Sequence, residues 1–243
     1  MSSTNSLFFR LSKTYPVIKN IFLYYNIYIR NLKFFFNTSQ FGEDKKILNL
    51  FNEKKQGFYL DLGCFHPIRQ NNTYLFYKSG WRGINIDLNP LTIDLFNIAR
   101  QNDINICAAI SEKKGSKDLF FDNELSSLNT INKNHTIFLK KAFNQIKLKK
   151  RRVKTNTINN LLRKYKIKEI DFMNIDIEGN ELEVLKTINF NKTNIKVICI
   201  EIVNYQFYSK KIKINKNKIF NILKKNKYNL KFKTFVNYIF VKK

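Results

Sequence analysis

The chain is poor in proline, glycine, cysteine and histidine. Only 3 prolines and 7 glycines occur in 243 residues, so we expect no long flexible linkers. The 3 cysteines contain no Cys-x-x-Cys pair and are accompanied by only 2 histidines, which argues against a zinc site of Cys and His ligands. We expect Cys64, Cys107 and Cys199 to be reduced thiols of a cytosolic protein, at or inside strands.

Long apolar runs are also missing. The best candidate, Asn20 to Ile29 between Lys19 and Arg30, is too short to cross a bilayer. It lacks the compact apolar segment and small-residue cleavage site of a signal peptide. We therefore expect no transmembrane segment and a cytoplasmic location, with contact at a membrane surface left open.

What the chain does contain is apolar residues and positive charge. Hydrophobic residues make up 44% of it, enough for a packed core. The 44 basic and 18 acidic residues give a formal charge of +26, which ordinarily indicates nucleic acid, anionic lipid or an acidic substrate. Lys, Asn, Ile and Phe all have AT-rich codons, so genome composition explains part of this bias. Nucleic acid is therefore an open but not a favoured partner.

Two parts are expected along the chain. Residues 1–38 form an aromatic and basic arm, helical from Val17 to Phe36, and residues 39–243 form the main domain. Packing of the arm on the domain is the expected role; a membrane surface or a partner contact are the alternatives.

Strands and helices alternate through the domain, which predicts an α/β fold with a mainly parallel sheet and flanking helices. Two consecutive strands at the end predict an antiparallel C-terminal edge strand. Leu119–Phe121 is a further short strand, and the basic run Lys147–Lys154 is either a solvated edge strand or a phosphate contact. The seven main strands are expected at Phe58–Leu62, Trp81–Asp87, Ile104–Ile110, Ile170–Ile177, Ile195–Val203, Asn229–Phe235 and Asn237–Lys242.

The segment around Asp61 and Gly63 carries the strongest functional signal. An apolar run ends in Asp-x-Gly, a helix follows, and a second apolar run ends in Asp87. Gly63 permits a sharp turn, and Asp87 can accept hydrogen bonds from ribose hydroxyls. This order is typical of a nucleotide-type cofactor site at the carboxyl edge of an α/β sheet.

Ordered motifs in the chain resemble those of the FkbM family of S-adenosylmethionine-dependent methyltransferases. Two departures are Phe65 and Pro67, where many class I methyltransferases have glycines, and Asn174, where many relatives have Lys. The resemblance rests on Ser39–Asp44 (SQFGED), Asp61–Pro67 (DLGCFHP), Asn71–Phe76 (NNTYLF), Gly80–Pro90 (GWRGINIDLNP), Ile175–Leu185 (IDIEGNELEVL) and Val197–Glu201 (VICIE).

The resemblance implies a class I methyltransferase Rossmann-like fold with a seven-stranded sheet. It also implies S-adenosyl-L-methionine as cofactor and methyl transfer, usually to a hydroxyl oxygen of a sugar, glycan intermediate or other small molecule. The cofactor-binding residues it implies are Asp61, Gly63, Cys64, Asp87, Leu88, Ala109 and Glu43.

Acidic residues at two strand ends are the candidates for chemistry. Asp176 and Glu178 are expected to face the methyl group as general base or acceptor binder, and His66 is a second base candidate that could instead shape its turn. Asn72 and Glu201 are the expected substrate contacts. A divalent metal held by the acids with Glu201 is an alternative that the predicted site does not include.

Two other functions compete with this one. An RNA-modifying methyltransferase would use the positive charge, and a non-catalytic binding module would use the same fold without turnover. A NAD-dependent oxidoreductase is disfavoured because the Gly-x-Gly-x-x-Gly fingerprint is absent.

Overall fold

The structure is a computed structural model that describes residues 11–12, 14–35, 39–52, 54–124, 126–144, 146–203 and 216–243. The first ten residues of the expected arm lie outside the described residues, as do Phe36 and Ile214, where two expected helices end and begin.

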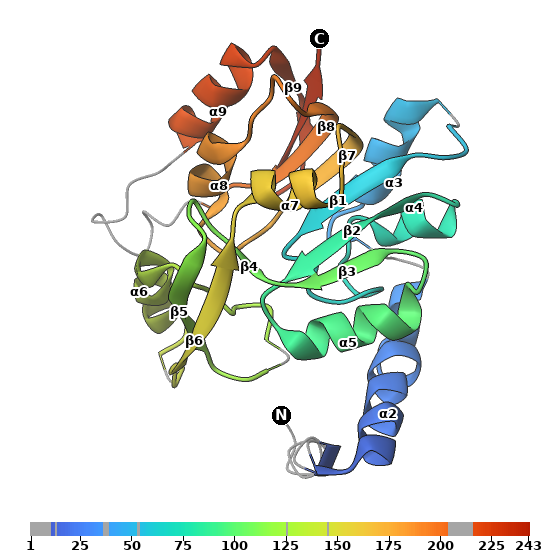
Figure 1. The fold of residues 1–243 in the computed structure, drawn as a ribbon, viewed down its shortest axis with the longest axis vertical. Coiled ribbons are helices and arrows are strands. Elements are labelled where there is room, and N and C mark those ends of the chain that lie inside the picture. Colours follow the sequence, from blue (N-terminus) through green and yellow to red (C-terminus); the bar gives the residue numbers. More distant parts are fainter. Residues whose placement is uncertain are drawn as a thin grey trace.

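A seven-stranded sheet forms the centre of the domain (Figure 1). Its strand order is β3-β2-β1-β7-β8-β10-β9, with the first five strands parallel and β10 antiparallel to both of its neighbours. The predicted fold, with its antiparallel C-terminal edge, is therefore confirmed. The strands are β1 (Phe58–Leu62), β2 (Arg82–Asp87), β3 (Ile104–Cys107), β7 (Glu169–Ile175), β8 (Asn194–Glu201), β9 (Tyr228–Lys233) and β10 (Asn237–Lys242).

Helices cover both faces of this sheet because its strands are apolar on both sides. Tyr59 points to the face that packs against α3 (Glu43–Leu48) and α4 (Tyr74–Lys78), while Leu60 and Leu62 point to the other. That second face is covered by α7 (Ile158–Lys164), α8 (Glu181–Thr187) and α9 (Lys216–Lys225). Helix α5 (Pro90–Ala99) packs beside β2 and β3.

The expected third strand divides into two. β3 pairs with β2 and ends at Cys107, and the chain then enters β4 (Ala109–Ile110) of a second sheet with order β4-β6-β5. β5 (Gly115–Phe121) contains the short strand expected at Leu119–Phe121, and α6 (Lys133–Ala142) follows it. This sheet lies at the left of Figure 1, beyond the carboxyl ends of the main strands.

The basic run lies in β6 (Lys149–Asn156), which is the central strand of the second sheet and not the expected edge strand. It can be central because its cations have acidic partners on the neighbouring segments. Asp118 forms ion pairs with Lys150 and Arg152, and Glu124 forms one with Arg151.

The described part of the arm packs on the domain, as expected. Helix α2 (Pro16–Tyr24) continues into a π-helical turn, Tyr25–Ile29, and a 3-10 turn, Leu32–Phe35. Phe22, Leu23 and Ile27 are buried in one apolar cluster with Leu95 of α5. The boundary at residue 38 stays a prediction. Among the described residues, no helix combines the length and apolar character needed to cross a bilayer.

Candidate functional site

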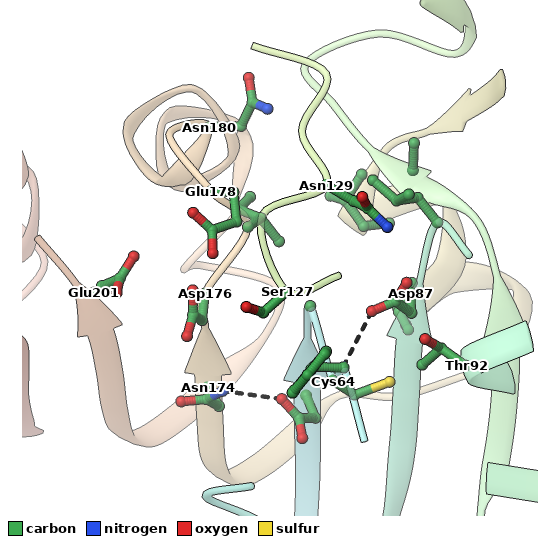
Figure 2. A pocket seen from close by; sticks show the side chains of 18 of the residues that line it. Cys64, Asp87, Thr92, Ser127, Asn129, Asn174, Asp176, Glu178, Asn180 and Glu201 are labelled. Atoms are coloured by element: carbon green, nitrogen blue, oxygen red, sulfur yellow. Dashed lines mark hydrogen bonds between the residues drawn. The ribbon is translucent and has the colours of Figure 1, made fainter. Parts of the chain in front are cut away.

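A cavity of about 270 Å³ lies where the carboxyl ends of β1, β2, β7 and β8 meet. Parallel strands bring residues that are far apart in sequence to one edge of the sheet. Figure 2 shows acidic side chains on one side of this cavity and Asp87 with Thr92 on the other. The predicted site residues that line it are Asp61, Gly63, Cys64, Asn72, Asp87, Leu88, Ala109, Asp176, Glu178 and Glu201. Their roles stay predictions.

Gly63 turns the chain at the end of β1. Its φ is +80°, and its backbone N–H donates to the carbonyl oxygen of Ile86 at 2.9 Å. A Cβ atom at this position would lie 1.7 Å from the backbone oxygen of Asp176. Only glycine therefore permits the contact between the turn after β1 and the end of β7.

Replacing Gly63 with alanine should lower the free energy of unfolding by about 2–4 kcal/mol, from the positive φ and the overlap together. Urea unfolding measures this loss. Gly42 is the matched control, since its φ is +74° and no atom lies within 4 Å of a Cβ built there. Gly42→Ala should cost only about 1 kcal/mol. Equal losses in the two variants would show that the contact with Asp176 has no energetic role.

Asp87 joins the ends of two loops beside the cavity. Its Oδ2 accepts the backbone N–H of Phe65 at 3.1 Å and its Oδ1 that of Asn89 at 2.8 Å. The side chain of Asn89, and not that of Asp87, caps α5 by accepting the N–H of Leu91. Burial raises the pKa of Asp87 to about 6, so its carboxylate forms near neutral pH.

The wall next to Asp87 is apolar, with one buried acceptor. Leu88 and Ala109 line the cavity there, as expected from the sequence. Asn129, in the loop before α6, also lines it, and its buried Oδ1 has no hydrogen-bond partner in the described part of the chain. This loop was not predicted, because its polar residues carry no periodic or motif signal.

Asp61 is fully buried and holds a hydrogen-bonded network at the floor of the cavity. Its Oδ1 accepts Nδ2 of Asn174 at 2.9 Å, and its Oδ2 accepts the hydroxyl of Thr73 at 2.8 Å. Nδ2 of Asn71 donates to the same Oδ2 at 3.2 Å. The carboxyl group of Asp61 thus joins two segments, because it accepts from Asn71 and Thr73 before α4 and from Asn174 in β7.

Asn72 and Asn174 extend this network. Nδ2 of Asn72 donates to Oδ1 of Asn174 at 3.1 Å, and both side chains line the cavity. Asn174 therefore links Asp61 to Asn72, although it stands where many relatives have lysine. Its amide has one donor and one acceptor engaged, which a lysine could not reproduce.

A cluster of carboxylates occupies the opposite side (Figure 2). Asp176 follows β7 and Glu201 ends β8, and ligand atoms of both lie within 4.8 Å of one another and of Glu181. The carboxyl groups of Asp176 and Glu201 are therefore close enough for the ionisation of one to affect the other. Burial and the neighbouring Glu181 carboxylate raise the pKa of Asp176 to about 7. Burial and Asp176 raise the pKa of Glu201 well above its usual range, so we place the proton of this pair on Glu201.

Two further acids surround this pair. Glu178 has a φ of +52°, and its Oε2 lies 3.2 Å from Nε2 of His135. Glu181, which was not predicted, accepts the backbone N–H groups of Ile177 and Gly179 with one oxygen and so holds the turn after β7. The donor set of Asp176, Glu181 and Glu201 is of the kind that hard divalent cations prefer.

His66 does not enter the cavity, which corrects its prediction as a base. Its Nδ1 accepts the backbone N–H groups of Ile68 and Arg69 at 3.1 and 3.0 Å. Its Nε2 lies 3.3 Å from the backbone oxygen of Asn26 in the arm, which identifies Nε2 as the protonated nitrogen. Burial lowers the pKa of His66 to about 3. The alternative expected role, shaping the turn, is the one the geometry supports.

Glu43, which was predicted to contact the cofactor, does not line the cavity. It is fully buried, and its carboxylate accepts the backbone N–H of Phe41 at 2.8 Å and Nδ2 of Asn237 at 2.5 Å. Glu43 thereby ties the start of α3 to β10. The nearby residue that does line the cavity is Gln40.

Comparison with known proteins found a family model and a solved structure that match this chain. A family model described as the methyltransferase FkbM domain matches residues 61–230. A TehB-like SAM-dependent methyltransferase from Corynebacterium glutamicum is similar in structure, with 12% identity, a TM-score of 0.42 and coverage of 85% of this chain and 90% of that one. No curated protein sequence matched. Since the family model spans most of the chain, the protein belongs to the FkbM methyltransferase family.

Proposed function

We propose that the protein transfers a methyl group from S-adenosyl-L-methionine to a hydroxyl oxygen of a sugar or glycan intermediate. The observation that carries this proposal is the close pair of carboxyl groups, Asp176 and Glu201, in the cavity wall. A carboxylate whose pKa is near neutral pH is suited to take the proton of a hydroxyl group. Because Glu201 retains a proton, it can stabilise the Asp176 carboxylate by donating a hydrogen bond to it.

The residues of the cavity fit the chemistry of this cofactor. When bound, S-adenosyl-L-methionine supplies a methyl group that is already activated as a sulfonium. Asp87 would accept ribose hydroxyls, Leu88 and Ala109 would contact the flat base, and the free Oδ1 of Asn129 would accept its amino group. At the other end of the cavity, the carboxylate of Asp176 would attract a cationic group when it is ionised.

A second cavity, of about 710 Å³, supports a hydroxyl-rich acceptor. It adjoins the first at Ile131, Asn180 and Glu201, which line both. Most of its wall is made of polar side chains from β5, from α6 with its N-cap, and from α8. Examples are Lys117, Asn132, His135 and Glu183. A site with many hydrogen-bonding side chains selects a polar acceptor over an apolar one.

One of the two features that favour RNA as acceptor, the basic run, is partly neutralised within the chain, while the net charge of +26 remains. The basic run that suggested it has acidic partners for Lys150, Arg151 and Arg152. Charges that are paired within the chain contribute less to binding of phosphates. We therefore place sugar and glycan acceptors first, and RNA serves as a comparison substrate in the test.

Replacing Asp87 with asparagine should weaken binding of S-adenosylhomocysteine by about 10–100-fold, since hydrogen bonds to a charged acceptor are lost while the shape is kept. Titration calorimetry measures this change. Wild-type affinity should also fall as the pH is lowered through about 6, where Asp87 takes up a proton, and the variant should lack this dependence.

Asp94→Asn is the matched control, because Asp94 lies on α5 and pairs with Lys19 at the surface. It should bind like the wild type. Transfer of a radiolabelled methyl group to nucleotide sugars, glycans and RNA then tests the acceptor. Tight cofactor binding with turnover on RNA alone, or on no acceptor, would overturn the proposed acceptor class.

A further inference from the structure

The arm carries a stripe of exposed apolar side chains that no other described segment matches. Of the fourteen large hydrophobic side chains exposed in the described part of the chain, eight lie between residues 11 and 32. Val17 is 70% exposed, Leu32 61% and Ile21 55%. Contiguous exposed apolar surface on a folded domain marks a contact surface.

These side chains share one face of the arm. Val17, Ile21 and Tyr24 are spaced by three or four residues on or just inside α2, which places them along one side of that helix. Tyr28 continues the row, since its ring lies 5.8 Å from the ring of Tyr24, and Leu32 follows in the next turn. The opposite face is the one that packs on α5 and the domain. One side of the arm is therefore packed on the domain, and the apolar stripe lies on the other side. Helix α2 extends beyond α5 at the bottom of Figure 1.

The charge around the stripe indicates what covers it. Residues 1–42 contain five basic and no acidic residues. Arg30 and Lys33 are both exposed in the same part of the arm as Leu32. Tyr24 and Tyr28 combine an apolar ring with a polar tip, a combination favoured where a lipid surface meets water. We infer that this face of the arm docks on a membrane surface that contains anionic lipid.

The positive charge of the arm also favours an anionic membrane over a second copy of the chain as the partner. A two-fold interface through the stripe would bring the basic side chains of two arms together without any acidic partner from the arms themselves. An anionic lipid surface neutralises the same side chains and receives the apolar ones. Docking is a property of the arm and does not depend on the proposed reaction.

Flotation of the full chain with vesicles tests the inference. The wild type should float with vesicles of phosphatidylcholine and phosphatidylglycerol, should not float with phosphatidylcholine alone, and should be released by high salt. The variant Val17→Gln/Ile21→Gln/Leu32→Gln should have a partition coefficient onto the anionic vesicles that is lower by about 10-fold or more, because three apolar side chains no longer enter the lipid. All three positions are exposed, so folding should be preserved, and binding of S-adenosylhomocysteine checks it.

A control variant, Ile137→Gln/Phe143→Gln/Leu230→Gln, removes three exposed apolar side chains outside the arm. It should float like the wild type. Three results would overturn the inference: no wild-type binding to anionic vesicles, equal binding to neutral ones, or wild-type partitioning by the stripe variant. A concentration-dependent dimer, seen by sedimentation velocity without vesicle binding and abolished by the stripe variant, would also overturn it and assign the face to a second copy.

Discussion

Replacing Asp176 with asparagine should lower the rate of methyl transfer by about 10²–10⁴-fold, the range that a positioned general base contributes. The expectation rests on the proposed function and on two features of the site. Asp176 follows β7 in the cavity wall, and the carboxyl group of Glu201 lies within 4.8 Å of it. Asparagine keeps the size of the side chain but cannot accept the proton of a hydroxyl group.

The pH dependence of the rate should carry the same signature. Because the pKa of Asp176 is about 7, its carboxylate is populated above that pH, and the wild-type rate should rise as the pH increases through about 7. The apparent pKa belongs to the pair with Glu201. In the Asp176→Asn variant the rate should no longer rise through about pH 7, so the acidic limb of the pH profile should disappear. Titration calorimetry should still detect binding of S-adenosylhomocysteine.

Glu169→Gln is the matched control, since Glu169 is exposed at the opposite end of β7 from Asp176 and lines neither cavity. It should retain the wild-type rate and pH profile. A variant at Asp176 that keeps the acidic limb, or loses only a small part of the rate, would show that another group takes the proton.

The fold followed from the sequence because its signals are local. The apolar run of β1 was predicted with the bounds that the structure gives, Phe58–Leu62, and both the parallel sheet and its C-terminal pair are confirmed. The third strand was predicted too long, since the apolar run from Ile104 to Ile110 continues without a break in pattern. Its division at Ala108 depends on the partner strand β6, more than 40 residues away in sequence.

The site was predictable in its strand ends and not in its side-chain orientations. Asp87 and Asp176 lie where any polar residue after a buried parallel strand must lie. His66 and Glu43 are close to the cavity in sequence, yet their partners are Asn26 in the arm and Asn237 in β10. Local sequence carries no information about such distant partners.

Arg100 is the clearest residue that the sequence concealed. One arginine among 44 basic residues gives no signal, yet this side chain is fully buried beneath the cavity. Its guanidinium donates to the backbone oxygen of Pro67, to Oδ1 of Asn71 at 2.6 Å and to the hydroxyl of Thr73 at 2.8 Å. Thr73 in turn donates to Asp61, so Arg100 supports the buried carboxylate through one intervening hydroxyl.

Replacing Arg100 with leucine should lower the free energy of unfolding by about 3–5 kcal/mol, the cost of removing one partner from a buried charged network. Urea unfolding measures the loss. Arg100→Lys keeps the charge but not the forked donors, so it should lie between the wild type and the leucine variant.

Combining Arg100→Leu with Asp61→Asn tests the origin of the cost. Arg100 lowers the pKa of Asp61 against the opposing effect of burial, so the two charges stabilise each other. The double variant should therefore lose less stability than the sum of the single losses. Additive losses would show that Arg100 stabilises the fold independently of the Asp61 charge, through Pro67, Asn71 and the rings it packs on. A loss below about 1 kcal/mol in the single variant would contradict the role of Arg100 in the network.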